Sequence, residues 1–584
     1  MAAFAIADRR RSFLGAALAR YRGAFTTVGV LSAVLNVLLL GGSLYMMLVY
    51  DSVLPSHSVP TLIGLLIMIA IVYVFQGVFD AMRTRILHDI SAGFDRDISP
   101  LVQRAILDAR QRGVKLPGDG LTLMRDFDQV RGFLGGPGPG ALMDLPWILF
   151  FLAVLSLLHI WLGVTALVGA IFMMSLTLLT DRQTKQATAR ASQVAAVRNG
   201  MAENILRHSE LLTALGMRER MQGRWEQVNA AFQGAQGKLT HVVGLYGGIS
   251  KVTRMFLQSL ILTIGALLVI DGKASGGVIF ASSILSGRAL APVDAAIANW
   301  KNLAAARLGW GRINELLRHV SPDPEVSTVL PAPRHELAVD NLAVSPPGTQ
   351  RVTVQNASFT LKAGSALGIV GPSAAGKTSL GRALVGVWAP VRGSVRLDGA
   401  TLDQWPAAIL GEHLGYLPQT VELLEGTVAD NIARFENDYS SETVIAAARA
   451  AGVHELIVQL PKGYETPVGA DGGELSAGQR QRIGLARALY KDPFLVLLDE
   501  PNSNLDAAGE AALERAVAGI RARGGIAVLI AHRPSALAQA SHVLFMQNGR
   551  AEAFGPRDEV LARISAPAQR KSIEPRPAPA QAEA

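Results

Sequence analysis

The chain has 584 residues, of which 50% are hydrophobic and only 17% are charged, and it contains no cysteine. It is too long for one ordinary domain, and its mean hydropathy of +0.29 is too high for a soluble protein of this size. The lack of cysteine excludes disulfides, cysteine-ligated zinc and a cysteine nucleophile. The formal net charge of +8 fits either nucleic-acid binding or basic loops beside a membrane, so the distribution of charge must decide.

Residues 1–24 form a basic segment that contains DRRRSFLGAALARYRG. Arg10 and Arg11, followed by an apolar pair, resemble a twin-arginine export signal. Such a signal needs an uninterrupted apolar region of about 7–15 residues, and Arg20 and Arg22 interrupt this one. We therefore interpret residues 1–24 as a basic cytoplasmic segment that precedes a first membrane helix.

Long uncharged runs dominate residues 25–320, which we predict to be a transmembrane domain with six helices. The runs cover residues 24–50, 59–79, 145–180, about 255–270 and about 274–293, and the last of them contains one charged residue, Arg288. The run 145–180 has no charged residue and is long enough for two spans, with a turn near residues 159–163, because one span needs about 20 residues. The alternative for a single run is a buried core helix, but buried helices seldom stay uncharged for so long.

The lysines and arginines between these runs predict the topology. Residues 1–24 hold five, residues 81–140 nine and residues 181–254 eleven, whereas residues 51–58 and 271–275 hold only Lys273. The positive-inside tendency therefore places both termini and both long loops of a multi-pass membrane protein in the cytoplasm. The basic excess is explained by this topology, and no interleaved aromatic residues support binding of nucleic acid.

The long loops carry helix-favouring patterns, so we expect the spans to continue as long helices into the cytoplasm. Residues 321–335, with four prolines, form a predicted linker that ends this helical part. Residues 336–565 alternate strand and helix patterns, such as SALGIVG, FLVLLDE and GIAVLIAH, and predict an α/β nucleotide-binding domain. Residues 566–584 are rich in Ala, Pro and Gln and are predicted to be a disordered tail.

The stretch GPSAAGKTSL at residues 371–380 matches the phosphate-binding pattern G-x-x-x-x-G-K-[ST] through Gly371, Gly376, Lys377 and Thr378. In this pattern backbone N–H groups surround phosphates, the Lys reaches the outer phosphates and the hydroxyl binds Mg²⁺. The motif alone does not say what the nucleotide is used for.

Further motifs follow in a fixed order: Gln419 in GYLPQT, then LSAGQ at 475–479, FLVLLDE at 494–500, SNLD at 503–506 and His532 in LIAHRP. Asp499 ends a buried apolar strand, as expected of an acid that holds Mg²⁺ through water. Glu500 is placed to act as the general base for an attacking water. A single interior histidine is weak evidence, and LSAGQ alone would fit a helix cap, but together and in this order they indicate one site.

With these motifs the sequence resembles the ATP-binding cassette (ABC) transporters over almost its whole length. The resemblance implies an α-helical six-span transmembrane domain of the ABC exporter type, fused to a C-terminal α/β P-loop ATPase domain that uses ATP and Mg²⁺. One cassette behind six spans resembles a half-transporter, which implies a homodimer whose LSAGQ segment completes the ATP site of the other subunit. The implied catalytic residues are Glu500, His532 and Gln419; the implied metal-binding residues are Thr378, Gln419 and Asp499; the implied nucleotide-binding residues are Gly371, Pro372, Ser373, Ala374, Ala375, Gly376, Lys377, Thr378, Ser379, Ser476, Gly478, Gln479 and Asp506.

Finer motifs resemble the permease/ATPases of bacterial type I secretion, and most nearly the exporters of alkaline proteases, lipases and haem carriers. They are VYDSVLPS, FDQVRGFLGGPGPGALMDLPW, SILSGRALAPVDAAI and LLDEPNSNLD. This resemblance implies export of an unfolded protein with a C-terminal signal. It also implies a periplasmic membrane-fusion adaptor and an outer-membrane channel of the TolC type as partners. Only about 24 residues precede the first span, so we expect no N-terminal peptidase-like domain.

Two positions depart from the family pattern. Pro346 stands where many exporters stack an aromatic ring on adenine, which leaves base selectivity open, and Ala470 stands where many carry a Glu, with Asp471 beside it. A lipid or drug exporter remains an alternative function, and an ATP-gated channel or regulator is a more remote one. In the sixth span we expect Arg288 to face the translocation path and to meet an acid such as Asp80 or Asp144, rather than Asp294 on its own helix.

Overall fold

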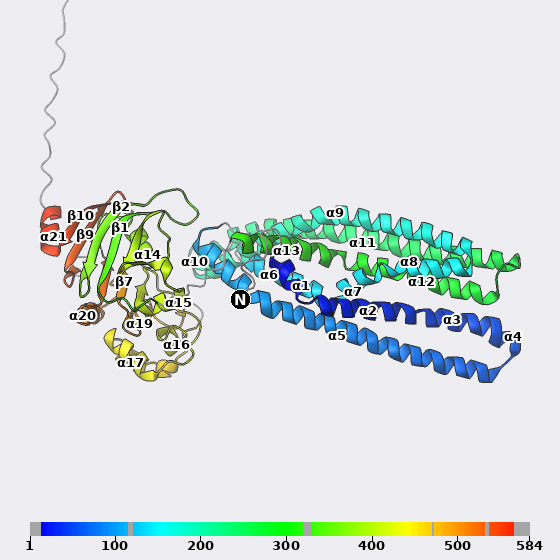
Figure 1. Ribbon diagram of the computed structural model, residues 1–584. Helices are drawn as coiled ribbons and strands as arrows, with labels where there is room; N and C mark the ends of the chain where they lie inside the picture. The colour runs from blue at the N-terminus through cyan, green and yellow to red at the C-terminus, as the bar shows by residue number, and fades with distance from the viewer. Residues whose placement is uncertain (1–12, 115–120, 320–329, 470–471, 532–536, 566–584) are drawn as a thin grey trace, which may run out of the picture. The chain divides into compact units, whose positions relative to one another are not determined.

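A computed structural model describes residues 13–114, 121–319, 330–469, 472–531 and 537–565 (Figure 1). The described chain divides into two compact units: a helical unit within residues 13–319 and an α/β unit within residues 330–565, with which residues 111–114 also group.

The helical unit is built almost entirely from long helices that run side by side (Figure 1). In chain order its elements are α1 (Phe13–Ala19), α2 (Arg22–Leu38), α3 (Leu40–Leu48), the π-helical turn η2 (Val49–Val53), α4 (Leu54–Ser56), α5 (Val59–Gln111), α6 (Leu121–Leu134), α7 (Pro137–Asp144), α8 (Trp147–Leu158), α9 (Ile160–Arg207), α10 (Ser209–Ala214), α11 (Arg218–Ile270), α12 (Gly276–Ala298) and α13 (Trp300–His319).

Six helices within the described ranges are long and apolar enough to cross a membrane, as the sequence predicted. They span Arg22–Ser56, Val59–Gln111, Gly138–Leu158, Ile160–Arg207, Arg218–Ile270 and Gly276–Ala298. The run 145–180 is indeed two helices, because the backbone at His159 is extended (φ −164°, ψ 137°) and its side chain accepts a hydrogen bond from the N–H of Trp161. His159 therefore ends one helix and caps the next.

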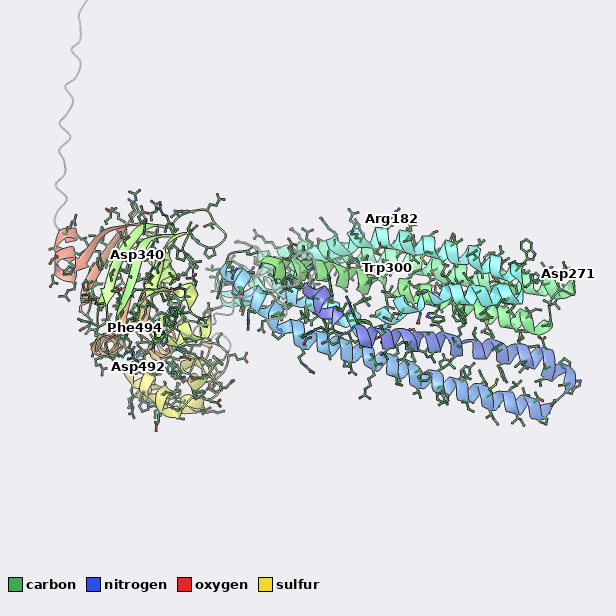
Figure 2. All side chains as sticks on the ribbon, in the orientation of Figure 1. Arg182, Asp271, Trp300, Asp340, Asp492 and Phe494 are labelled. Carbon is green, nitrogen blue, oxygen red and sulfur yellow. The ribbon has the colours of Figure 1, made fainter. Side chains whose placement is uncertain are left out.

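The long helices also confirm that the spans continue beyond the membrane. Helices α5 and α11 each have 53 residues and α9 has 48. At 1.5 Å per residue these are about 70–80 Å long, whereas the hydrocarbon core of a bilayer is about 30 Å thick. Asp271, in the turn after α11, lies at one end of the helical unit (Figure 2), and the far ends of the helices lie well outside the lipid.

A network of polar side chains joins three helices inside this unit. Arg83 on α5 donates to Asp144 Oδ2 on α7 at 2.9 Å and to Asp80 Oδ1 at 2.8 Å, and Asn36 on α2 donates to Asp144 Oδ1 at 3.0 Å. The expectation that Arg288 meets Asp80 or Asp144 is therefore wrong. Both carboxylates already bind Arg83, since an arginine within a span is stabilised by the acids nearest to it.

Asp294 on α12 is paired with the neighbouring helix α11. Its carboxylate accepts a hydrogen bond from Ser250 Oγ at 2.6 Å and lies 2.5 Å from Arg254 Nε. Asp294 and Arg288 do not pair with each other, as expected from their six-residue separation on one helix.

The VYDSVLPS segment joins the end of the first span to the start of the sixth. Asp51 accepts hydrogen bonds from Ser275 Oγ at 2.6 Å and from the N–H of Gly277 at 2.7 Å, while the rings of Tyr50 and Phe280 stack with centroids 4.1 Å apart. A Cβ on Gly277 would lie 2.6 Å from Asp51, so a glycine is needed for this approach. Asp51 thus caps the N-terminus of α12 from another helix.

Replacing Asp51 by alanine should loosen this connection. We expect Asp51→Ala to destabilise the protein by about 1–2 kcal/mol, the usual cost of losing a helix cap. The check is the apparent Tm of the purified protein in lipid nanodiscs, with Ser52→Ala, on the adjacent exposed residue, as the matched control. Equal Tm values for the two variants would show that the cap does not hold the helices together.

The α/β unit surrounds one mixed sheet. Its strands are β1 (Glu336–Val344), β2 (Val354–Lys362), β3 (Ala366–Val370), β4 (Arg392–Leu397), β5 (Ala400–Thr401), β6 (Leu414–Leu417), β7 (Leu495–Asp499), β8 (Ile526–Ile530), β9 (His542–Gln547) and β10 (Arg550–Pro556). Its helices are α14 (Lys377–Leu384), η3 (Leu402–Gln404), α15 (Ala407–His413), α16 (Val428–Ile432), α17 (Ser441–Ala450), α18 (His454–Val458), η4 (Gly463–Glu465), α19 (Ala477–Leu489), α20 (Ala507–Ala522) and α21 (Arg557–Ser565).

The ten strands of the described chain follow the order β5-β4-β1-β2-β10-β9-β3-β8-β7-β6. Strands β6, β7, β8 and β3 are parallel neighbours, and every residue of β7 and β8 is buried, as their uninterrupted apolar sequences predict. Because parallel strands end at the same edge of a sheet, the segments that follow these four strands gather there.

Candidate functional site

The phosphate loop follows β3 and ends where α14 begins at Lys377. Gly371 has φ 152° and Gly376 has φ 95°, and a Cβ on Gly376 would lie 2.5 Å from the carbonyl oxygen of Thr353. Glycine is therefore required at Gly376 for both its conformation and its space. The free N–H groups of the first turn of α14 adjoin the loop, which is the arrangement that binds phosphate.

The side chains of the loop leave its surface open to a ligand. Pro372, Ser373 and Ala374 are exposed, Ala375 is buried and Ser379 is half-buried in the first turn of α14. Ala374 has φ 63°, an uncommon conformation for a residue with a Cβ. The loop thus presents backbone rather than bulky side chains.

Lys377 is only 6% exposed and folds back over the loop, where its Nζ donates to the carbonyl oxygens of Gly371 at 2.8 Å and Pro372 at 2.9 Å. Burial lowers the pKa of the Lys377 ammonium, while the charges of Glu500 and Asp499 oppose that shift. The ammonium is therefore held over the loop, bonded to carbonyl oxygens that the oxygens of an anion could replace.

Asp499, at the end of β7, is 2% exposed and accepts a hydrogen bond from the Thr378 side chain. Burial raises the pKa of the Asp499 carboxyl, and the bond from Thr378 opposes that shift. Its Oδ1 atom is buried without a hydrogen-bond partner among the described residues. A buried acceptor of this kind needs a cation or a donor, and oxygen ligands are those that Mg²⁺ prefers, so Thr378 and Asp499 fit this metal.

Glu500 follows Asp499 in a left-handed conformation (φ 50°), which is uncommon for a residue with a Cβ and costs about 1–3 kcal/mol. Its N–H donates to the carbonyl oxygen of Ile530, the last residue of β8, at 2.9 Å. The strained turn redirects the chain at the sheet edge directly after Asp499.

The sheet register places Gln419 and Glu500 at corresponding positions after neighbouring strands. Leu417 on β6 pairs with Leu498 on β7. Gln419 comes two residues after Leu417, and Glu500 comes two residues after Leu498. Gln419 is exposed at this edge. His532 follows Ile530 by two residues on the next strand, but it lies outside the described residues.

The LSAGQ segment begins α19 rather than joining the phosphate loop. Ser476 and Gln479 form a capping box, in which Ser476 Oγ accepts from the N–H of Gln479 and Gln479 Oε1 accepts from the N–H of Ser476. A Cβ on Gly478 would lie 3.0 Å from the carbonyl oxygen of Asn504. Asp506 caps α20 through the N–H of Gly509, which lowers the pKa of its carboxyl. Within the described residues, none of the hydrogen bonds and ion pairs of Ser476, Gln479 and Asp506 reaches the phosphate loop.

Gln481 is a residue that the sequence motifs did not single out. It is 3% exposed on α19, and its Nε2 lies 2.5 Å from the carbonyl oxygen of Pro501 and 3.4 Å from that of Glu500. Its Oε1 accepts from the N–H of Asn504 at 3.2 Å. One buried amide thus connects the LSAGQ helix to the loop that carries Glu500.

Arg382 is a second residue that the sequence motifs did not single out. It lies on α14, where its guanidinium stacks over the ring of Trp388 at 4.9 Å and bonds the hydroxyl of Tyr416. Its charge also opposes the rise in the pKa of Asp499. A cation on the phosphate-loop helix could have been noticed from its five-residue spacing after Lys377, but only the fold shows that it lies near Asp499.

The two departures from the family pattern have different outcomes. Pro346 lies just after β1, and its carbonyl oxygen accepts bonds from the N–H and the hydroxyl of Thr349 in a turn, so this position offers no aromatic ring to a base. Ala470 and Asp471 lie outside the described residues.

Comparison with known proteins agrees with this geometry. Residues 354–503 match the family ABC transporter, and residues 25–292 match the ABC transporter transmembrane region. The type I secretion system ATP-binding protein PrsD of Rhizobium meliloti (strain 1021) is 50% identical over 95% of both chains. The cyclolysin secretion/processing ATP-binding protein CyaB of Bordetella pertussis (strain Tohama I) is 28% identical over 94% of this chain and 77% of its own.

A solved structure shares the fold. A bacterial Atm1-family ABC exporter with ATP bound superposes with a TM-score of 0.79 at 22% identity, covering 94% of this chain and 97% of the other. The similarity extends across the helical and the α/β units, which confirms the expected fold class.

We expect Gln481→Met to slow ATP turnover at least about tenfold while leaving nucleotide affinity unchanged. Methionine keeps the volume of Gln481 but cannot bond the loop carbonyls, and each lost bond costs about 1–3 kcal/mol at a buried group. The check is kcat at saturating ATP, together with the Kd of a fluorescent ATP analogue. Gln459→Met, on an exposed glutamine at the end of α18, is the control for the added methionine. Normal turnover by Gln481→Met would show that the amide does not position the loop.

Proposed function

The chain belongs to the ABC transporters of type I secretion systems, and from that premise we propose how its residues couple ATP hydrolysis to export. It is a multi-pass inner-membrane ATPase that drives protein export. The observation that carries the mechanism is that one chain joins six spans to a sheet edge where Lys377, Asp499 and Glu500 meet.

Binding of the triphosphate is assigned to the phosphate loop. The N–H groups of residues 371–379 would surround the phosphates, and Lys377, already held beside the loop, would neutralise the outer ones. Mg²⁺ would be held by Thr378 and Asp499, with Gln419 at the end of the adjacent strand, and when bound it would neutralise charge on the phosphate oxygens. The unpartnered Oδ1 of Asp499 supports this assignment.

Hydrolysis is assigned to Glu500 as the general base. A carboxylate at this sheet edge can orient a water and take its proton as the water attacks the terminal phosphate. His532, which follows β8, would contact that phosphate. The fixed turn at Glu500 would keep the base in place without a later rearrangement.

The active unit is proposed to be a homodimer. In one chain, Ser476 and Gln479 cap α19 and Gly478 lies in its first turn, and their contacts do not include the phosphate loop among the described residues. A second copy would supply these residues, together with Asp506, to the nucleotide held by the first. ATP binding would then draw two cassettes together, and hydrolysis would release them.

The cargo is proposed to be an unfolded protein with a C-terminal signal. It would pass from the cytoplasm through this homodimer, a periplasmic membrane-fusion adaptor and a TolC-type outer-membrane channel. Both chain termini would be cytoplasmic, since the basic residues lie in the loops on that side. The 50% identity with a type I secretion protein favours this cargo over the lipid or drug alternative. A regulator that only binds ATP would not need Glu500.

Glu500→Gln should abolish ATP turnover but preserve nucleotide binding, because the amide keeps the shape and polarity of the side chain but cannot accept the proton. Phosphate release and nucleotide binding by the purified variant check the chemistry. Cells that carry only this variant should also fail to secrete one or more proteins that wild-type cells secrete. Glu514→Gln, on the exposed face of α20, is the control. Hydrolysis near the normal rate would mean that Glu500 is not the base.

Lys377→Ala should weaken nucleotide binding itself, by about tenfold or more, because it removes a charge that faces the triphosphate. The measurement is the Kd of a fluorescent ATP analogue, compared with Lys362→Ala at the exposed end of β2 as the control. An unchanged Kd would contradict the role of Lys377.

A further inference from the structure

A cavity of 670 Å³ lies among the helices of the helical unit. Its lining includes Arg110 at the end of α5, Thr122 on α6, Ser192, Asn204 and Arg207 on α9, and Arg312 on α13. A smaller cavity of 190 Å³ shares Thr122 and Ser192 with it and extends the lining along α11 and α13. The larger volume falls within the range of about 300–1,000 Å³ that is usual for ligand sites.

The cavity lies outside the lipid. The uncharged part of α9 ends at Thr180, and Ser192 and Arg207 follow it by 12 and 27 residues. At 1.5 Å per residue they lie about 18 and 40 Å further along the helix. These helix ends are near α6 and α10, at the opposite end of the unit from Asp271 (Figures 1 and 2). By the proposed topology this end is cytoplasmic.

The larger cavity carries a net positive charge because its lining has three arginines and one acid, Glu203, and both Glu203 and Asp126 of the smaller cavity are already paired. Asp126, 2% exposed, binds Arg312 through both oxygens at 2.5 and 2.6 Å, and Glu203 binds Arg207 at 3.0 Å. None of the described carboxylates pairs with Arg110 in the ion pairs of the structure. One guanidinium is therefore available to a ligand, and that of Arg207 is paired only at the exposed surface.

The remaining lining is rich in amides and hydroxyls. Thr122, Ser192, Gln193 and Asn204 line the larger cavity, and the smaller one adds further polar side chains: Gln129, Asn199, Gln236 and Lys301. Amide and hydroxyl groups can donate to and accept from peptide groups, whereas guanidinium groups bind carboxylates with two parallel bonds. The combination suits an extended acidic peptide.

We propose that this cavity binds an acidic segment of the exported polypeptide before it enters the membrane. Arg110 would bind a carboxylate side chain, and the amides of α9 would bind the peptide backbone beside it. This inference rests on the proposed function, since it assigns to the exported protein a contact site in the cytoplasmic part of the helical unit.

The first test measures binding of a probe peptide to the full-length protein in lipid nanodiscs. The probe is a fluorescein-labelled unstructured peptide of Asp, Gly and Ser, and its partner probe has Asn in place of every Asp. Arg110→Gln should weaken binding of the acidic probe about tenfold, the usual cost of losing one charged hydrogen-bonded contact, and leave the Asn probe unaffected. Arg104→Gln, six residues earlier on α5 and exposed, is the matched control.

The second test uses the absence of cysteine from the chain. Asn204→Cys places the single thiol in the cavity, and Arg104→Cys places it on another face of α5. An acidic probe that carries a pyridyl disulfide should form a mixed disulfide with Asn204→Cys and release thiopyridone, at a rate well above that of Arg104→Cys. A small maleimide reports whether each thiol is accessible in the assembled protein.

The proposal is overturned if Arg110→Gln binds the acidic probe as tightly as the unmodified protein, or if the two probes bind alike. It is also overturned if Asn204→Cys is inaccessible to maleimide, or if excess inorganic phosphate displaces the acidic probe completely, which would indicate a site for a free anion. Basal ATP hydrolysis by Arg110→Gln should be unchanged. Loss of probe binding with retained hydrolysis thus separates this inference from the proposed function, which fails only if hydrolysis or secretion is independent of Glu500.

Discussion

The ATP site depends on one buried carboxylate. Asp499 is 2% exposed at the end of a fully buried strand, and a charge in that place is tolerable only with donors or a cation around it. Thr378 and Lys377 interact with it from the helix that follows the phosphate loop. These interactions hold the loop and the end of β7 in a fixed position relative to each other. The strained turn at Glu500 and the amide of Gln481 then transmit that geometry to α19.

A second constraint comes from the lipid. Helices α5, α9 and α11 are far longer than a bilayer is thick, so one continuous element carries both the apolar membrane surface and a polar surface beyond it. Within the bundle, charged side chains occur in groups such as Arg83 with Asp144 and Asp80, or Arg254 with Asp294. The helical backbone is continuous between the two regions, so each of these helices connects its far end directly to its membrane part.

The two units therefore differ in the surroundings of their charged side chains. The α/β unit gathers the opposite charges of Lys377, Asp499 and Glu500 at a partly buried sheet edge, where they interact strongly with one another. The helical unit has an exposed arginine, Arg110, in its cavity, with no ion-pair partner among the described residues. At the other end of the bundle, Asp51 caps α12, and the VYDSVLPS segment thereby joins the first span to the sixth.

The sequence alone determined the architecture, and it predicted which residues form the ATP site. Hydropathy placed the spans and the break near His159, since lipid accepts little besides uncharged helix, and the order of the phosphate loop, Gln419, LSAGQ, Asp499 and Glu500 indicated the nucleotide chemistry. The sequence could not predict which groups the charged side chains bind. Arg83 rather than Arg288 holds Asp80 and Asp144, and Gln481 binds the loop of Glu500, because such contacts depend on how helices rotate and pack against each other. Local pattern fixes which face of a helix is apolar, but only the packed structure decides which polar groups meet, since each pairing joins residues far apart in the chain.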